Sequence, residues 1–195
     1  QVDEISTYRS VARYLIAKEP RFEVLKDHSL EFIDSFCFAL RDDETELKDS
    51  LDKVIKEMQS DGTLDRLTKE YITDINAEND PPAVELPHFD NADTIKVAVT
   101  GDLPPLDFVS ADGKPAGFNT AVLAEISNRM LKNIELVQIE SGARAAALTS
   151  KQVDVVFWAI VPVSEIIPSD SDKPSGVILT DPYYKDKIVH MVFKE

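Results

Sequence analysis

Residues that commonly carry catalysis or bind metals are few in this chain and lie far apart. The three histidines, His28, His88 and His190, show no metal-ligand spacing such as HExxH. The nucleophile elbow GxSxG, the P-loop and the dinucleotide motif GxGxxG do not occur. The single cysteine, Cys37, lies in an apolar run and is typical of a small buried hydrophobic residue. The sequence therefore predicts no catalytic residue, no metal site and no cofactor, and we expect a protein that is not an enzyme.

Three other segments could bind a ligand because each follows an expected strand. In open α/β sheets ligands lie beyond the carboxyl ends of the strands, which here selects residues 102–108, 141–144 and 158–163. Arg144, at the start of a short expected helix, is a candidate anchor for an anion, and the simpler interpretation is a solvated arginine at a helix start. Phe108 and Trp158 could stack on a ligand or pack in the core.

The elements that must position these segments alternate along the second half of the chain. We expect strands at 95–100, 134–139, 153–159 and 188–193, with helices at 119–131 and from 141 onward. Strands interleaved with helices of this length indicate βαβ units. The predicted fold class is therefore α/β, with a mainly parallel sheet flanked by helices.

The first half contains two expected helices, at 46–60 and 63–73. In the first of them apolar residues recur at helical spacing: Leu47, Leu51, Val54, Ile55 and Met58. This pattern predicts that the helices pack on a core. Residues 75–93 contain Pro81, Pro82 and Pro87 and show no periodicity, which is the composition of a linker.

The composition narrows the classes of partner. A net charge of -15 disfavours nucleic acid and anionic membrane surfaces, because phosphate binding needs a concentrated basic surface. An apolar fraction of 43% with 29% charged residues is ordinary for a globular protein. No apolar run approaches the ~20 residues that span a bilayer.

The second half resembles the first lobe of bacterial extracellular solute-binding proteins of family 3, the type II periplasmic binding proteins that capture polar amino acids. Four pieces occur in the family's order: IKVAVTGDLPPLDF, DGKPAGFNTAVLAEI, ALTSKQVDVVFWAI and TDPYY. The first half resembles the end of such a module, through VDEISTYRSVARYL and the closing helices ETELKDSLDKVIKEMQSDGTLDRLTKEYITD. The C-terminal part of a module thus precedes the N-terminal part of a module in this chain. We therefore expect a piece of a tandem array or a permuted single lobe.

The resemblance implies a division into three parts. Residues 1–74 correspond to the C-terminal part of one module, with a small-lobe remnant at 1–30 and the returning strand and closing helices at 36–74. Residues 75–93 form the linker, and residues 94–195 correspond to the first lobe of a following module. We expect the closing helices to pack on the later sheet, within the chain or by exchange with a neighbouring copy in a swapped homodimer.

The resemblance also implies roles for single residues. Asp102 stands where a polar residue often meets the ligand, and Leu106 stands where an aromatic usually stacks on it. Ala159 and Val161 would offer backbone contacts. The two threonines and the arginine that clamp the ligand's carboxylate in the family are replaced by Val161, Val163 and Ile166. The usual clamp is therefore absent from this lobe.

The function implied is an extracytoplasmic solute-binding domain of a membrane transporter or sensor, taking a small polar or amphipathic solute. One alternative is a ligand-free structural or interaction module of a sensor array. Another is a dehydratase-like enzyme on the same fold, with Asp102 or Asp107 as general acid.

Overall fold

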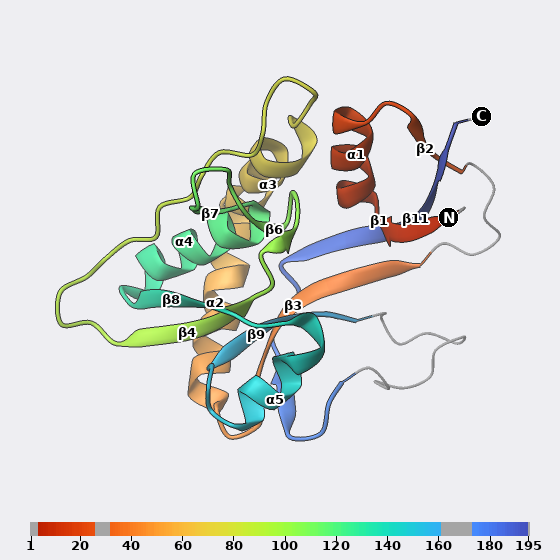
Figure 1. The fold of residues 1–195 in the computed structure, drawn as a ribbon. Coiled ribbons are helices and arrows are strands. Elements are labelled where there is room, and N and C mark those ends of the chain that lie inside the picture. The colour runs from red at the N-terminus through yellow and green to blue at the C-terminus, as the bar shows by residue number, and fades with distance from the viewer. Residues whose placement is uncertain (1–3, 26–31, 161–172, 195) are drawn as a thin grey trace.

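Residues 4–25, 32–160 and 173–194 are described by the computed structural model of this chain. Within these residues one sheet of eight strands runs in the order β1-β11-β3-β9-β4-β8, with β2 and β10 at its margins. The strands are β1 (Ile5–Tyr8), β2 (Phe22–Val24), β3 (Ile33–Arg41), β4 (Thr94–Val99), β8 (Asn133–Gln138), β9 (Val155–Ile160), β10 (Val177–Leu179) and β11 (Tyr184–Phe193). The α/β fold class is confirmed, with helices around this sheet (Figure 1).

Parallel pairing covers a smaller part of the sheet than the sequence predicts. β4 pairs in parallel with both β8 and β9. β3 runs antiparallel to β9, β10 and β11, and β11 runs antiparallel to β1 and β2. Parallel neighbours need a crossover connection, and helices supply it only from β4 through α4 (Phe118–Met130) to β8 and from β8 through α5 (Arg144–Thr149) to β9. The sheet is therefore mixed, and its parallel order is confined to β8, β4 and β9.

The alternation of side chains along the central strands produces two cores, one on each face of the sheet. Phe38 and Leu40 of β3 and Val97 of β4 join the larger core, whereas Ala39 and Ala98 join the smaller one. α2 (Thr45–Ser60), α3 (Thr63–Thr68) and α4 cover the larger core, and α5 covers the smaller one (Figure 1). The two faces of the sheet are therefore covered by separate helical layers.

The helices of the first half of the chain pack on the sheet that the second half of the same chain builds. Leu51, Val54, Ile55 and Met58 of α2 are buried in one cluster with residues of β4 and α4. Burying a side chain of this size contributes about 1.5–3 kcal/mol. The expected packing of the closing helices is present within one chain.

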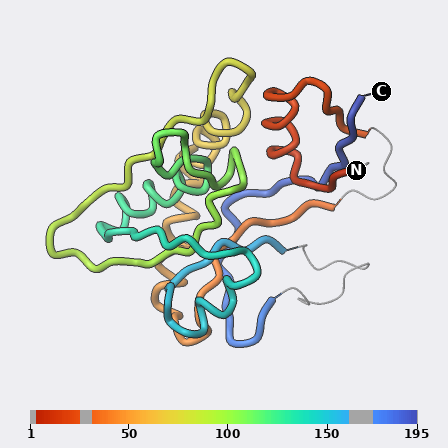
Figure 2. The backbone as a smooth tube through the Cα atoms, in the orientation of Figure 1, coloured from red at the N-terminus to blue at the C-terminus, as the bar shows by residue number. Residues whose placement is uncertain are grey.

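The segment between the helices and β4 runs around the outside of α4 (Figure 2). It begins after η1 (Lys69–Thr73), the turn of π-helix that ends the early helical layer. Val84 is buried in the larger core, and its amide donates a 3.1 Å hydrogen bond to the carbonyl of Pro115. The side-chain oxygen of Asn133 accepts a 2.8 Å bond from the amide of Phe89. The proline-bearing segment is thus attached along its course.

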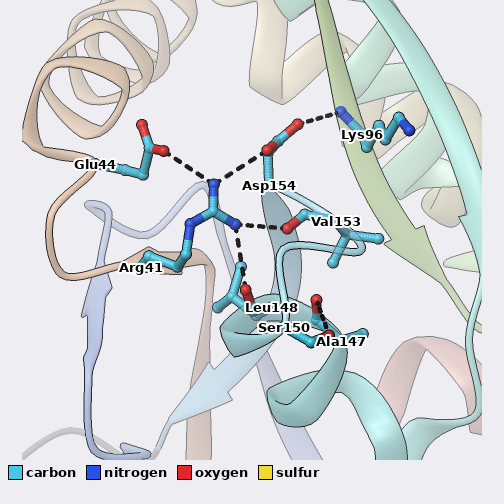
Figure 3. A network of polar contacts seen from close by, with 8 residues as sticks. All are labelled: Arg41, Glu44, Lys96, Ala147, Leu148, Ser150, Val153 and Asp154. Carbon is cyan, nitrogen blue, oxygen red and sulfur yellow. Dashed lines mark hydrogen bonds and ion pairs between the residues drawn. The ribbon is translucent and has the colours of Figure 1, made fainter.

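A buried arginine joins the early strand to the late ones (Figure 3). Arg41, at the end of β3, donates to the carbonyl oxygens of Leu148 and Val153 at 3.2 and 2.7 Å. It also pairs with Glu44 at 2.9 Å and Asp154 at 3.1 Å. Asp154 in turn accepts a 2.9 Å bond from the amide of Lys96 in β4. One side chain therefore ties β3 and α2 to the turn that precedes β9.

A smaller unit is built on the far end of β11. There α1 (Arg9–Lys18) packs its Ala12 against Val189 and Met191 of β11. β1 and β2 pair with the same strand. β11 thus belongs to both units, since its earlier residues pair with β3 and its later residues pair with β1 and β2.

Candidate ligand-binding site

A cavity of about 530 Å³ lies at the carboxyl ends of β4 and β9. A small three-stranded sheet, β5 (Asp102–Leu103), β6 (Asp107–Val109) and β7 (Pro115–Ala116), forms one side of it. The lining residues come from elements far apart in the sequence: Tyr8, Phe36, Ala98, Thr100, Asp102, Leu103, Asp107, Asn119, Ser141, Arg144, Phe157, Trp158 and Ala159. All three segments that the sequence selects as ligand-binding candidates contribute residues to the lining of this cavity.

Arg144 is held in place at the wall of the cavity. Its Nε donates to the carbonyl of Ser141 at 3.0 Å, and its Nη1 donates to the carbonyl of Phe157 at 2.7 Å. The guanidinium carbon lies 5.0 Å from the centre of the Trp158 ring, which is cation–π distance. Burial lowers the pKa of Arg144, with Tyr8 and Asp107 acting in the opposite direction. An arginine side chain nevertheless stays protonated in proteins.

No carboxylate of the described residues forms an ion pair with Arg144. Two of its donor groups are used by backbone carbonyls, which carry no net charge. The cation therefore retains its charge and further donors toward the cavity. This arrangement can bind an anionic group without first breaking an ion pair.

Asp107 is the buried acid of the cavity, with 6% of its surface exposed. Its Oδ2 accepts hydrogen bonds from the amide and the hydroxyl of Thr100 at 2.8 and 3.2 Å. Burial raises the pKa of this carboxyl, although hydrogen bonds from Thr100 and Gly101 act in the opposite direction. Asp102, on the same small sheet, is exposed.

Asn119 reaches the cavity from the first turn of α4. It is 5% exposed, and its side-chain oxygen accepts a 2.8 Å bond from the hydroxyl of the buried Tyr183. Because the oxygen is used, the side-chain nitrogen is the group left to donate to a ligand. Its position depends on Gly117, which has a φ of +106° and lies against the carbonyls of Pro105 and Leu106.

Aromatic residues from both units form another side of the cavity. The ring of Tyr8, which ends β1, meets that of Phe36 on β3 edge-on, with 4.8 Å between the centroids. The Tyr8 hydroxyl donates a 2.8 Å bond to Asp34. The small unit thus contributes a side chain to the same cavity as the large one.

The residues singled out from the sequence fall into three groups. Asp102, Arg144, Trp158 and Ala159 line the cavity. Leu106 and Phe108 do not line it: Leu106 is fully buried in the larger core, and the Phe108 ring lies 6.4 Å from that of Tyr14. The β5–β6 register pairs Leu103 with Asp107, so Leu103 rather than Leu106 shares the cavity face with Asp107. Val161, Val163 and Ile166 lie outside the described residues.

Sequence reasoning missed Tyr8, Phe36, Thr100 and Asn119. Phe36 lies in a strand that is apolar on both faces, so its sequence does not distinguish a cavity face from a core face. Asn119 follows Gly117 at the start of a helix, and a glycine that lets two backbones approach closely could have indicated it.

Comparisons with known proteins agree with this architecture. The family model of bacterial extracellular solute-binding proteins, family 3, matches residues 95–194. The probable ABC transporter arginine-binding protein ArtJ of Chlamydia trachomatis serovar D is 28% identical over 102 residues, covering 52% of this chain and 37% of that protein.

Solved structures of binding proteins are similar at lower identity. A binding protein from A. tumefaciens R10 in complex with agropinic acid gives a TM-score of 0.47 at 9% identity, covering 99% of this chain and 51% of that one. A phosphate-binding protein of a phosphate ABC transporter from Streptococcus pneumoniae TIGR4 gives 0.40 at 11% identity, covering 84% and 53%.

The chain spans 37% of the length of its curated relative, and 51% and 53% of these two structures. Among the described residues no helix is both long enough and apolar enough to cross a membrane. The family match covers just over half of the chain and includes every lining residue of the cavity except Tyr8 and Phe36. This chain therefore belongs to the bacterial extracellular solute-binding proteins, family 3.

Proposed function

We propose that this chain binds a small polar or amphipathic solute that carries an anionic group, and that Arg144 recognises that group. The observation that supports the proposal most strongly is the fixed guanidinium of Arg144, which faces the cavity without a carboxylate partner in the described part of the chain. The positions of the family's usual clamp hold Val161, Val163 and Ile166. Arg144 would replace that clamp from a different segment.

The remaining lining groups suit the rest of such a solute. Trp158 offers an aromatic surface, and the side-chain nitrogen of Asn119 offers a donor. Asp102 would accept a bond from a cationic or hydroxyl group on the ligand. Leu106 and Phe108 lie off the cavity and have no role in this proposal.

Tyr8 links ligand binding to the arrangement of the two units. It comes from the small unit, whereas the other lining residues belong to the large one. A ligand that contacts both units favours the arrangement in which they are closest, because it shifts an equilibrium only through its differential affinity for the two states. A membrane transporter or sensor domain would then recognise that arrangement on the extracytoplasmic side of the membrane.

The test is a thermal-shift screen of the whole chain against amino acids, small organic acids and amines, repeated with Arg144→Gln. A true ligand at 100 times its dissociation constant should add about 2.7 kcal/mol of stability. We expect organic anions or zwitterions among the ligands, and we expect Arg144→Gln to weaken their binding by about tenfold or more. Lys151→Gln, which removes one exposed cation elsewhere, is the matched control.

A screen in which no compound stabilises the chain would favour the ligand-free interaction module instead. Binding that survives Arg144→Gln unchanged would contradict the role given to this residue.

The enzymatic alternative depends on Asp107. A buried carboxyl with a raised pKa in a cavity is a common property of general acids. Three hydrogen bonds from Thr100 and Gly101 hold this carboxyl to its own loop, however, which favours a structural role. Loss of water from a cyclic hydroxy acid, abolished by Asp107→Asn, would support the alternative over solute binding.

A further inference from the structure

The helix of the small unit, α1, is attached to the large unit at both of its ends. Tyr8, which lines the cavity, holds the N-cap position of α1, and Lys18 is the last residue of the helix. Between them α1 contacts η1 of the early helical layer, beside α3 in Figure 1. The placement of α1 therefore decides where Tyr8 stands in the cavity wall.

The inner attachment is made by Asp34 of β3. Its Oδ2 accepts a 2.8 Å hydrogen bond from the hydroxyl of Tyr8, and the ring of Tyr8 lies edge-on to that of Phe36 on the same strand. Burial, and next the hydrogen bond to Asp34, raise the pKa of Tyr8, so the hydroxyl keeps its proton and remains a donor. Both the hydroxyl and the ring of Tyr8 are thus held by β3.

The other oxygen of Asp34 shows that this carboxylate is not placed for stability alone. Asp34 is 7% exposed, and its Oδ1 is buried without a hydrogen-bond partner among the described residues. An unpaired buried acceptor lowers the stability of a fold. A carboxylate here is better explained by the acceptor that it offers to Tyr8.

Asp186 of β11 fixes the first turn of α1 beside this bond. It lies directly opposite Asp34 in the β3–β11 register. Its Oδ2 accepts bonds from the hydroxyl and the amide of Ser10 at 2.5 and 3.2 Å. Two neighbouring strands thus hold the chain at Tyr8 and again two residues later.

The outer attachment is made by Asp80, in the proline-bearing segment that follows η1. Its Oδ1 lies 2.8 Å from the Nζ of Lys18 and accepts a 3.3 Å bond from the hydroxyl of Tyr14. The bond to Lys18 is the main cause of the lowered pKa of Asp80. The ring centre of Tyr14 lies 6.4 Å from that of Phe108, on the small sheet beside the cavity. The far end of α1 is therefore held against the large unit as well.

We propose that Asp34 and Asp80 act as positioning residues for ligand binding, by holding α1 so that Tyr8 stands in the cavity wall before any solute arrives. This role rests on the proposed function, because it takes the cavity to be the ligand site. A protein that already populates its binding-competent arrangement loses no affinity to molecules in another arrangement. Loss of either attachment would let the small unit move away from the large one and open the cavity.

The experiment uses Trp158, the single tryptophan, which lies in the cavity wall and reports opening without a ligand. Quenching of its emission by acrylamide, a small neutral solute, measures how freely the cavity is reached. The test variants of the whole chain are Asp34→Ala, which removes the acceptor of Tyr8, and Asp80→Lys, which repels Lys18. We expect each to raise the quenching constant by about twofold or more, because the equilibrium moves toward the open arrangement.

Two reversing variants separate positioning from a general loss of structure. Asp34→Asn keeps a carbonyl oxygen that can accept the bond from Tyr8, so its quenching constant should equal that of the native chain. Lys18→Glu added to Asp80→Lys restores opposite charges and should return the constant to the native value. Tyr8→Phe, which removes only the hydroxyl, repeats the test of the inner bond in case Asp34→Ala does not fold.

The matched control is Asp93→Lys, which breaks the exposed pair of Asp93 with Lys132, 2.8 Å apart and outside α1. Its quenching constant should not change. Far-UV circular dichroism checks that each variant is folded.

The thermal-shift screen tests solute binding separately, so the two proposals can fail independently. A rise in quenching in the variants of both attachments, removed by their reversing variants, supports the positioning role even if no compound in the screen binds. Native quenching when either attachment is broken overturns it, even where compounds bind through Arg144. A rise that the reversing variants do not remove, or that Asp93→Lys shares, also overturns it.

Discussion

Arg144 shows how a residue can be prepared for a ligand before the ligand arrives. Two carbonyl acceptors and the Trp158 ring fix its guanidinium, so little side-chain entropy remains to be lost on binding. A solvated arginine on a helix surface would have to be ordered first. This difference is why we assign the anion to Arg144 rather than to an exposed lysine.

The buried carboxyl of Asp107 predicts how the free energy of unfolding changes with pH. Its pKa is raised in the folded chain relative to an ordinary value of about 3.9 in the unfolded chain. The folded state therefore holds the proton more strongly, so the stability from this group is fully present below the unfolded pKa and is lost as pH rises through the folded pKa. We expect the free energy of unfolding of the native chain to fall relative to that of Asp107→Asn as pH rises from about 3 to 7.

Urea unfolding of both proteins across this range measures the difference directly. Taking the difference removes the contributions of other acids, such as Glu19 and Asp61, whose pKa values are lowered to about 2 by hydrogen bonds. A difference that stays constant, or that grows in favour of the native chain, would contradict the burial argument.

Single site residues were predictable from the sequence only where their position follows from the fold. Asp102 and Arg144 come after strands and Trp158 lies near the carboxyl end of β9, so the rule for open α/β sheets finds them. Leu106 was assigned by resemblance alone, and the structure places it in the core, where the β5–β6 turn directs it. Tyr8 was missed because, apart from Phe36, the other residues that line the cavity lie some 90 residues or more later in the sequence.

At the scale of elements, α4 and the small sheet meet so closely that only glycine fits between them. A Cβ at Gly117 would lie 2.6 Å from the carbonyl oxygen of Leu106 and 2.8 Å from that of Pro105. These same carbonyls accept bonds from the amides of Asn119 and Phe118. The close approach therefore sets where Asn119 and Asp107 stand in the cavity.

We predict that Gly117→Ala destabilises the chain by about 3 kcal/mol, since it adds a clash with backbone to an unfavourable φ. Gly113→Ala is the matched control: its φ is +78°, but nothing lies within 4 Å of its added Cβ. That variant should cost about 1 kcal/mol from the backbone conformation alone. Equal losses in chemical denaturation would refute the close-approach argument.

Long periodic elements were predictable, and short ones were not. The helix expected at 46–60 corresponds to α2 at Thr45–Ser60, because its apolar residues repeat over four turns. β5 and β7 have two residues each, too few for a period, so the sequence indicated only a loop there. The antiparallel neighbours of β3 were also missed, because pairing between distant segments leaves no local pattern in a single sequence.

In the whole molecule, strands from the first half of the chain complete a sheet whose other strands come from the second half. β3 lies between β9 and β11, and α2 covers the core that β4 and α4 share (Figure 1). The division into parts of two modules remains a proposal, as does exchange of the helices in a swapped dimer. The packing itself predicts that both halves unfold together.

Arg41 tests this coupling because its side chain contacts both halves. We predict that Arg41→Met lowers the free energy of unfolding by about 3 kcal/mol, since it leaves Asp154 and two carbonyls without their buried donor. Arg66→Met, which removes an exposed arginine paired with Glu70 and Glu125, should cost less than about 1 kcal/mol. Far-UV circular dichroism and tryptophan fluorescence should shift together in Arg41→Met; transitions that separate would show that the halves fold independently.

Binding of a solute in the cavity through Arg144, as proposed above, can be tested directly. Trp158, the single tryptophan of the chain, lies in the wall of that cavity beneath the Arg144 guanidinium. Titration of its fluorescence with each ligand found by thermal shift therefore reports on the site itself. We predict a saturable change in emission that disappears in Arg144→Gln, whereas a ligand that stabilises the chain and leaves the emission of Trp158 unaltered would contradict the account.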